Sequence, residues 1–232
     1  MAKKRSKRYR AAAELVDDEK IYSLAEAVGT LKKLPAPKFD QSVTVSMHLG
    51  VDPRKSDQMV RGTCPLPHGS GKEVKVLVFA SGDAAKAAEA AGAELVGFED
   101  MIEKVKGGFT DFDVAVATPD AMGEVRKLGR QLGPRGLMPN PKTGTVTNDV
   151  AEAIKAVKAG RVDYKIDRGG TIAVAVGKVS FTEDQITENA QAIIDSILRA
   201  KPASAKGRYV KSAHLAATMS PGFTLDSSGY NA

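Results

Sequence analysis

The middle third of the chain alternates short, mainly apolar runs with helical stretches, and this pattern narrows the choice of fold. Apolar runs at 74–80, 94–96 and 114–117 are each followed by a helical segment, at 83–91, 100–106 and 119–128, and a further helix at 149–159 ends at Gly160. Strands that are apolar along their whole length have both faces covered, and strand–helix–strand units join parallel strands through right-handed crossovers. The pattern predicts a small α/β domain with a parallel sheet.

The segment before this region shows a different pattern, typical of an α+β domain. Ser23 and Glu26 have the spacing of a capping box, and the helix that they begin is expected to stop at Pro35. Residues 43–49 then alternate apolar and polar side chains, as a half-buried strand does. Residues 58–64 indicate a weaker strand.

The segment after the α/β region returns to strands and turns. It predicts strands at 161–166 and 172–176 joined by a hairpin turn at 167–170, a helix at 183–199 and a last strand at 209–219. Proline and glycine at 65–71 interrupt regular structure between the first two regions. We therefore expect a two-domain chain of mixed α/β and α+β class: a discontinuous α+β domain of residues 1–67 and 161–232, and an inserted α/β domain of residues 68–160.

Basic side chains gather at the N-terminus. The net charge is +6, and residues 1–10 hold six basic groups and no acid, so the rest of the chain carries 28 groups of each sign. A second basic block covers residues 125–158. Blocks of one sign set up a directed field that attracts polyanions, although basic tails are also common as solvated surface.

Several classes of protein have little support. The lone cysteine, Cys64, excludes a disulfide framework and favours a reducing compartment, so we expect a cytoplasmic protein. No apolar run is long enough to span a bilayer, and the basic start lacks the apolar region of a secretion signal. Residues 69–72 resemble part of a phosphate loop, but Leu66 and Glu73 stand where that motif needs glycine and a hydroxyl residue. The three histidines fall in separate segments, and we predict no catalytic residue, metal or cofactor.

Residues 129–144 form a segment of four glycines, three prolines and three bases without an acid. A long connection without regular structure inside a domain is usually functional, and this one would present backbone amides and cations. The alternative is a loop that only packs against its own domain.

Part of this segment resembles a known family. Residues 132–147, LGPRGLMPNPKTGTVT, are similar to the signature of the ribosomal protein L1 family. Further similar segments are APKFD at 36–40, LGVDPRKSDQ at 49–58, VRGT at 60–63, LPHG at 66–69 and AELVG at 93–97. The resemblance covers almost the whole chain.

The resemblance implies a non-catalytic RNA-binding protein of the large ribosomal subunit, with the inserted domain Rossmann-like and joined to the first by a hinge. Its implied partners are large-subunit ribosomal RNA at the mobile stalk beside the tRNA exit site, the exit-site tRNA, and its own operon messenger RNA, whose translation it would repress. No membrane is implied, and outside the ribosome the protein would be a monomer.

The resemblance also implies site residues. The RNA-binding residues carried over are Lys38, Phe39, Asp167, Arg168, Ser212, Thr218, Met219 and Ser220, with secondary RNA contacts at Arg130, Arg135, Lys142, Lys3, Lys4 and Arg5. Lysine and arginine suit phosphates, an aromatic ring suits ribose or base, and a hydroxyl suits the ribose 2′-OH.

Two positions depart from the family pattern, and two residues have another interpretation. Relatives typically have glycine in place of Ser220, and many have an acid in place of Thr44. Phe39 could instead be a core aromatic, and Met219 continues the alternation of Ala213, Leu215 and Ala217, which would also bury it.

Two rival functions stay open at this point. The α/β segment could belong to an enzyme acting on nucleotides, in which case the purified protein would show turnover. The chain could also be a general cationic binder of nucleic acid or membrane surfaces acting through its tail, in which case deleting residues 1–10 would remove nearly all affinity.

Overall fold

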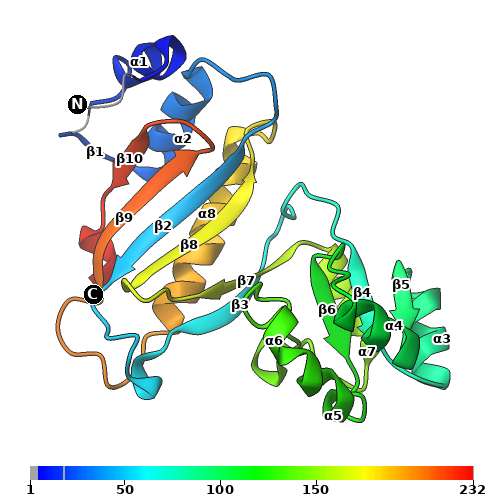
Figure 1. Ribbon diagram of the computed structural model, residues 1–232. Helices are drawn as coiled ribbons and strands as arrows, with labels where there is room; N and C mark the ends of the chain where they lie inside the picture. The colour runs from blue at the N-terminus through cyan, green and yellow to red at the C-terminus, as the bar shows by residue number, and fades with distance from the viewer. Residues whose placement is uncertain (1–4, 18, 232) are drawn as a thin grey trace. The chain divides into compact units, whose positions relative to one another are not determined.

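The protein has a mixed α/β fold, seen in a computed structural model that describes residues 5–17 and 19–231 (Figure 1). The chain divides into two compact units: unit 1 consists of Met1–Gly71 with Val162–Ala232, and unit 2 consists of Lys72–Arg161. The divisions predicted from sequence fall after residues 67 and 160. No helix in the described part of the chain is long and apolar enough to cross a membrane.

Unit 1 contains a five-stranded sheet with two of its helices, α2 (Leu24–Lys33) and α8 (Glu183–Arg199), on one face, and a separate pair of strands, β3 (Arg61–Pro65) and β7 (Arg161–Lys165). It also has helix α1 (Lys7–Ala13) and the short 3-10 turns η1 (Ser56–Gln58) and η4 (Ser228–Asn231). The strands of the sheet are β1 (Ile21–Tyr22), β2 (Ser42–Leu49), β8 (Thr171–Lys178), β9 (Val210–Ala217) and β10 (Gly222–Leu225), and β7 leads into unit 1 from unit 2.

The capping box predicted at the start of α2 is confirmed. The amide of Glu26 donates to Ser23 Oγ at 3.3 Å, and the amide of Ser23 donates to Glu26 Oε2 at 3.2 Å. Two otherwise unpaired amides are satisfied in this way, so the helix has a fixed first turn. Helix α8 begins with a second box, formed by Thr182 and Gln185.

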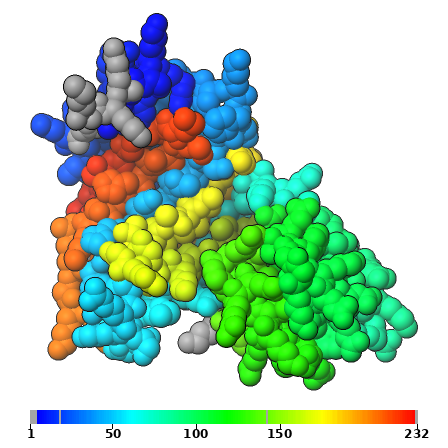
Figure 2. Space-filling view, in the orientation of Figure 1, coloured from blue at the N-terminus to red at the C-terminus, as the bar shows by residue number. Residues whose placement is uncertain are grey.

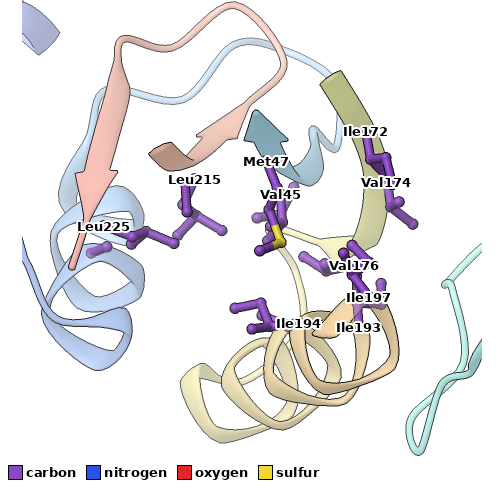
Figure 3. Close-up of a cluster of buried hydrophobic side chains, with 14 of the residues drawn as sticks. Val45, Met47, Ile172, Val174, Val176, Ile193, Ile194, Ile197, Leu215 and Leu225 are labelled. Atoms are coloured by element: carbon purple, nitrogen blue, oxygen red, sulfur yellow. The ribbon is translucent and has the colours of Figure 1, made fainter. Parts of the chain in front are cut away.

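The main sheet has the order β1-β10-β9-β2-β8, with β1 parallel to β10 and the other neighbours antiparallel. The alternation predicted for 43–49 is confirmed, because Val43, Val45, Met47 and Leu49 are each at most 1% exposed. Figure 3 shows side chains of β2, β8 and β9 directed toward Ile193, Ile194 and Ile197 of α8. The opposite face of the sheet carries the intervening polar and small residues.

Some predicted elements of unit 1 differ from the structure. Residues 161–176 do not form a hairpin, because β7 pairs with β3 and β8 pairs with β2. The last strand stops at Ala217 and the chain turns back into β10, which the sequence reading missed, as it missed α1 and the two-residue β1. Such short elements have too few residues to show a period. The sheet partner of β1 is also distant in sequence, since Ile21 pairs with Thr224 of β10.

Unit 2 has a parallel sheet of order β5-β4-β6, with helices on both faces. Its strands are β4 (Val76–Phe79), β5 (Leu95–Gly97) and β6 (Val114–Ala117), and its helices are α3 (Asp83–Ala90), α4 (Glu99–Lys106), α5 (Met122–Val125), α6 (Gly129–Leu132) and α7 (Val150–Lys158), with 3-10 turns η2 (Arg126–Leu128) and η3 (Pro141–Thr143). Alternate residues of β4 enter different cores: Val76 and Val78 pack with α3 and α7, and Leu77 and Phe79 pack with α4 and residues 121–132. This explains why the strand is apolar throughout.

The glycine- and proline-rich segment is more ordered than the sequence suggested. It begins with α6 and contains η3, and the helix expected at 119–128 is broken into α5 and η2. Leu132 is fully buried, and Thr143 and Thr145 hydrogen bond to each other and to the carbonyl of Asn140. The segment therefore does pack against its own unit, as the alternative interpretation held, while leaving Arg130 and Arg135 at the surface.

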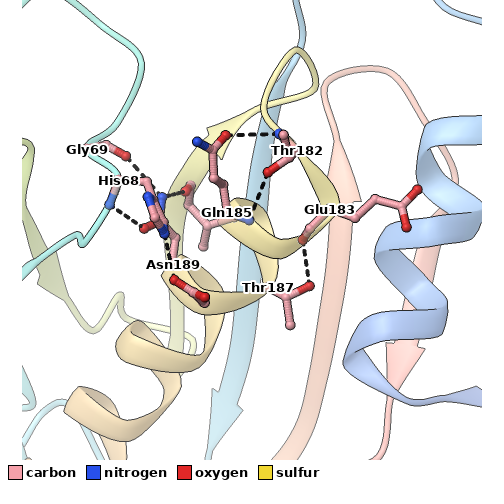
Figure 4. A network of polar contacts seen from close by, with 9 residues as sticks. His68, Gly69, Thr182, Glu183, Gln185, Thr187 and Asn189 are labelled. Atoms are coloured by element: carbon pink, nitrogen blue, oxygen red, sulfur yellow. Dashed lines mark hydrogen bonds and ion pairs between the residues drawn. The ribbon is translucent and has the colours of Figure 1, made fainter.

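A polar network holds the segment after β3 against α8 (Figure 4). Asn189 is fully buried; its Oδ1 accepts from the amide of His68 at 3.1 Å, and its Nδ2 donates to the carbonyls of Gly69 and Val176 at 3.0 and 2.8 Å. His68 Nε2 lies 2.6 Å from Glu188 Oε2. The chain is thus fixed to unit 1 until just before residue 72.

Candidate nucleic-acid interface

The loop that leads from α2 into β2 presents an aromatic ring and a cation to solvent. Phe39 is 50% exposed and Lys38 is exposed, so the interpretation of Phe39 as a core aromatic is wrong. The loop is held at its end by Asp40, whose carboxylate accepts from the amide and hydroxyl of Ser180 at 3.2 and 2.9 Å. The ring is therefore presented from a fixed backbone.

The turn after β9 places Met219 at the surface. Its side chain is 63% exposed, and it is the one described residue other than glycine with positive φ, at 64°. A left-handed conformation costs an L residue roughly 1–2 kcal/mol, and such strain persists only where surrounding contacts impose it. The interpretation that Met219 continues the alternation of β9 and is buried is therefore wrong, because the turn takes this residue out of the strand.

Two hydroxyl residues build this turn. Thr218 donates its amide to the carbonyl of Ser42 at 3.0 Å, and Thr218 Oγ1 accepts from the amide of Ser42 at 3.2 Å. Ser220 Oγ accepts from the amide of Ala217 at 2.9 Å and donates to the carbonyl of Pro221 at 2.7 Å. Ser220, at the position where the family resemblance led us to expect glycine, thus closes the turn with its own side chain.

These residues meet at the start of β2. Ser42 lies between Lys178 of β8 and the Thr218 turn, and Lys178 Nζ donates to Ser42 Oγ at 3.0 Å. The sequence reading missed Lys178 and Ser42, because the antiparallel register that joins them is set by residues 136 positions apart. We call Lys38, Phe39, Thr218, Met219 and Ser220 the start-of-β2 cluster.

The other carried-over residues lie at the opposite end of the same strand. His48 is paired with Ser212 on one side and with Thr171 on the other, and the amide of Leu49 donates to the carbonyl of Gly170 at 2.8 Å. The turn of Asp167 and Arg168 is therefore near Ser212. From Ser42 to His48 a strand advances about 20 Å at ~3.3 Å per residue, so the eight residues form two groups and not one.

Asp167 has a structural task in this second group. Its Oδ1 accepts from the amides of Gly169 and Thr171, both at 2.8 Å, which fixes the turn. Arg168 is exposed at the rim of an open hollow of about 530 Å³. The hollow is lined by Pro53, Met59, Lys165, Ile166, Asp167 and Arg168.

Between the two groups the open face of the sheet carries small, hydroxyl and imidazole side chains, without lysine, arginine, aspartate or glutamate. Its residues on β2, β8 and β9 are Ser42, Thr44, Ser46, His48, Thr171, Ala173, Ala175, Ser212, His214 and Ala216. Figure 2 shows this face uncovered, with β8 in yellow beside β2 in blue. Thr44, where the family resemblance led us to expect an acid, donates to the carbonyl of Ala216 at 3.2 Å. Lysine and arginine side chains thus flank a strip that exposes hydroxyl and imidazole groups.

The secondary residues are spread over both units. Arg130 and Arg135 are exposed on unit 2, where Arg135 donates to the hydroxyl of Thr110. Arg5 lies on unit 1, with its guanidinium 4.5 Å from the ring centre of Tyr9. Lys3, Lys4 and the side chain of Lys142 are outside the described residues.

The Cys64 thiol lies in the core of unit 1, whereas His48 and His214 lie on the open face of the sheet. Burial raises the pKa of the Cys64 thiol, which is 4% exposed. Within residues 5–17 and 19–231 no three histidine, cysteine, aspartate or glutamate side chains are grouped so that they could hold a metal ion. The described histidines contact carboxylate and hydroxyl groups of unit 1, at Glu188, Thr171 and Thr224.

An exposed aromatic ring, flanking lysines and a hydroxyl-lined face are the groups with which proteins read the sugar and backbone of folded RNA. Residues 31–221 match the model of the ribosomal protein L1p/L10e family. The chain belongs to this family, as the resemblance of residues 132–147 predicted.

Three similar proteins from bacteria carry the same name. The chain is 56% identical over 223 residues to "Large ribosomal subunit protein uL1" of Thermobifida fusca, covering 96% of this chain and 95% of that protein. The proteins of the same name from Bifidobacterium longum subsp. infantis and Lactobacillus delbrueckii subsp. bulgaricus are 55% and 56% identical over 96% of this chain and 97% and 96% of their own length. These are names of ribosomal proteins and not of enzymes, which confirms the prediction of a non-enzymatic protein.

Proposed function

We propose that this chain is an RNA-binding structural protein of the large ribosomal subunit, and that unit 1 binds folded ribosomal RNA at the mobile stalk beside the tRNA exit site. The observation that carries the proposal is the start-of-β2 cluster. Phe39 and Met219, both at least half exposed, stand beside Lys38 and the Thr218 hydroxyl, and Met219 is held there in a strained conformation. Strain of this kind is a sign of a site where geometry matters more than stability.

The chemistry of the cluster suits a structured RNA. Lys38 neutralises a phosphate, Phe39 and Met219 pack on ribose or base, and the Thr218 and Ser220 turn presents hydroxyl and backbone groups to the 2′-OH. Asp167, Arg168 and Ser212 form a second contact region about 20 Å along β2, which is roughly seven base pairs of an A-form helix at about 2.8 Å each. Because the strip between them has no lysine or arginine, recognition depends on shape and sugar contacts as well as on phosphates.

The two units have different tasks in this proposal. Unit 1 is a discontinuous RNA-binding domain, and unit 2 is an inserted Rossmann-like domain; the parallel sheet with helices on both faces supports the second assignment. Arg130, Arg135 and Lys142 of unit 2, with Lys3, Lys4 and Arg5 of the N-terminus, make secondary contacts to RNA or tRNA phosphates. The protein assists release of deacylated tRNA and represses its own messenger RNA by binding a copy of the ribosomal site.

Quantitative binding of the purified protein to a stalk RNA fragment tests the proposal. The wild-type protein is expected to prefer this fragment over a shuffled RNA of equal length, and a variant with Phe39→Ala and Thr218→Val is expected to lose that preference without unfolding. Equal affinity for both RNAs would refute the proposed function.

The salt dependence of affinity tests the role of Lys38. Replacing Lys38 by Met removes one phosphate contact, so the slope of log affinity against log salt should fall by roughly 0.7 to 0.9. Lys86→Met is the matched control, since this lysine side chain is 82% exposed on α3 of unit 2 and pairs with Asp83. An unchanged slope for Lys38→Met would show that this lysine does not meet a phosphate.

A further inference from the structure

Helix α1 carries an arginine that joins two loops of the candidate site. Arg8 Nη2 donates to the carbonyl of Met219 at 3.1 Å, and Arg8 Nη1 donates to the carbonyl of Pro35 at 3.4 Å. Pro35 begins the loop that presents Phe39. Two loops that are 184 residues apart in sequence therefore share one guanidinium, and Figure 1 shows α1 at the end of unit 1 where the α2–β2 loop and the β9–β10 turn meet.

The helix that holds Arg8 is itself anchored in unit 1. Ser6 Oγ accepts from the amide of Tyr9 at 3.2 Å and caps the helix, and Ala12 is 2% exposed. After the helix, Val16 joins the main core, and the amide of Asp17 donates to Tyr22 Oη at 3.0 Å. The N-terminal segment from residue 6 is thus a built part of the domain, and its basic residues are not equivalent.

The chemistry of arginine suits this bridging position. A guanidinium is charged at all ordinary pH values and has a planar fork of donors, so it can hold two carbonyl oxygens in a fixed spacing. One of these carbonyls belongs to the single described non-glycine residue with positive φ. A strained turn needs contacts that impose its conformation, and Arg8 supplies one from outside the turn.

We propose that Arg8 is a positioning residue of the RNA site: it fixes the separation of the Phe39 loop and the Met219 turn instead of contacting phosphate itself. This rests on the proposed function of unit 1. It also separates the basic residues of the N-terminus by role. Arg8 hydrogen bonds to carbonyls of the protein, whereas Arg10, on the same helix, is exposed.

The test compares Arg8→Met with Arg10→Met in binding to the stalk RNA fragment across a salt series. For Arg8→Met we expect roughly tenfold weaker binding, the usual effect of losing charge-assisted hydrogen bonds, with the salt slope of the wild type. Arg8→Lys keeps the positive charge but lacks the planar pair of guanidinium donors, so this variant should bind the RNA with intermediate affinity. Arg10→Met should keep an affinity close to that of the wild type at moderate salt.

Denaturant unfolding and a double variant separate positioning from loss of fold. Arg8→Met should unfold cooperatively with its RNA affinity reduced, and in a Met219→Gly background the same substitution should have a much smaller effect, because the turn no longer needs an imposed conformation. The inference would be overturned if Arg8→Met bound RNA with wild-type affinity. It would also be overturned if this substitution lowered the slope of log affinity against log salt by roughly 0.7 to 0.9, or if its effect and that of Met219→Gly were fully additive. Failure of the wild-type protein to prefer stalk RNA would instead overturn the proposed function.

Discussion

Met219 allows stability and RNA binding to be separated in one experiment. Its φ of 64° costs an L residue roughly 1–2 kcal/mol, and glycine, which has no such cost, loses about 0.5–1 kcal/mol more backbone entropy on folding. Met219→Gly should therefore raise the free energy of unfolding by about 0.5–1 kcal/mol. Met219→Ala keeps the strain and removes only an exposed side chain, so it should change stability by less than about 0.5 kcal/mol.

RNA affinity should move in the opposite direction. Full burial of a methionine side chain is worth about 1.5–3 kcal/mol, and 63% of this residue is free to be covered, so contact with RNA is worth roughly 1–2 kcal/mol, or about a tenfold change. Both variants should lose this amount, measured by filter binding beside urea unfolding. A glycine variant no more stable than the alanine variant would refute the assignment of strain, and unchanged affinity in both would refute the RNA contact.

Two further predictions concern unit 1 away from the RNA site. Asn189→Leu leaves the buried Val176 carbonyl and the half-buried His68 amide and Gly69 carbonyl without their partner, so the free energy of unfolding should fall by about 2–4 kcal/mol. Thr187→Val is the control, because the Thr187 hydroxyl donates to the carbonyl of Glu183 within α8. Equal effects of the two substitutions in denaturant unfolding would contradict the argument. Because burial raises the pKa of the Cys64 thiol, its thiolate fraction in the folded protein stays small at pH 8 and increases only above the usual range of a free cysteine. Alkylation of the folded protein should therefore be much slower than in denaturant and should still accelerate above pH 9; rapid labelling at pH 8 would show that the thiol is accessible.

The local elements of this protein were predictable from sequence. The capping box at Ser23, the alternation of 43–49 and the long helix at 183–199 depend on residues within a few positions of one another, and the structure has all three. The same applies to the apolar strand at 114–117 in unit 2. Periods and caps are short-range properties, so a single sequence contains them.

The candidate site was predictable only in part. The residues of the start-of-β2 cluster came from resemblance to a family, and the alternation along β9 argued that Met219 should be buried. The turn at 218–220 reversed that argument, because a positive φ at Met219 removes it from the strand. The hairpin predicted at 161–176 is wrong for a similar reason, since β7 and β8 pair with the distant strands β3 and β2 and not with each other.

What the sequence alone determined is therefore the order of elements, the membership of a ribosomal protein family and the residue types at the site. Tertiary structure decided which of these residues meet: Ser42 with Lys178 and Thr218, and Arg8 with Pro35 and Met219. The physical reason is the range of the interactions. Helix caps and alternation act between neighbours in the chain, whereas strand pairing and a guanidinium shared by two loops join segments whose separation in sequence carries no sign of their contact.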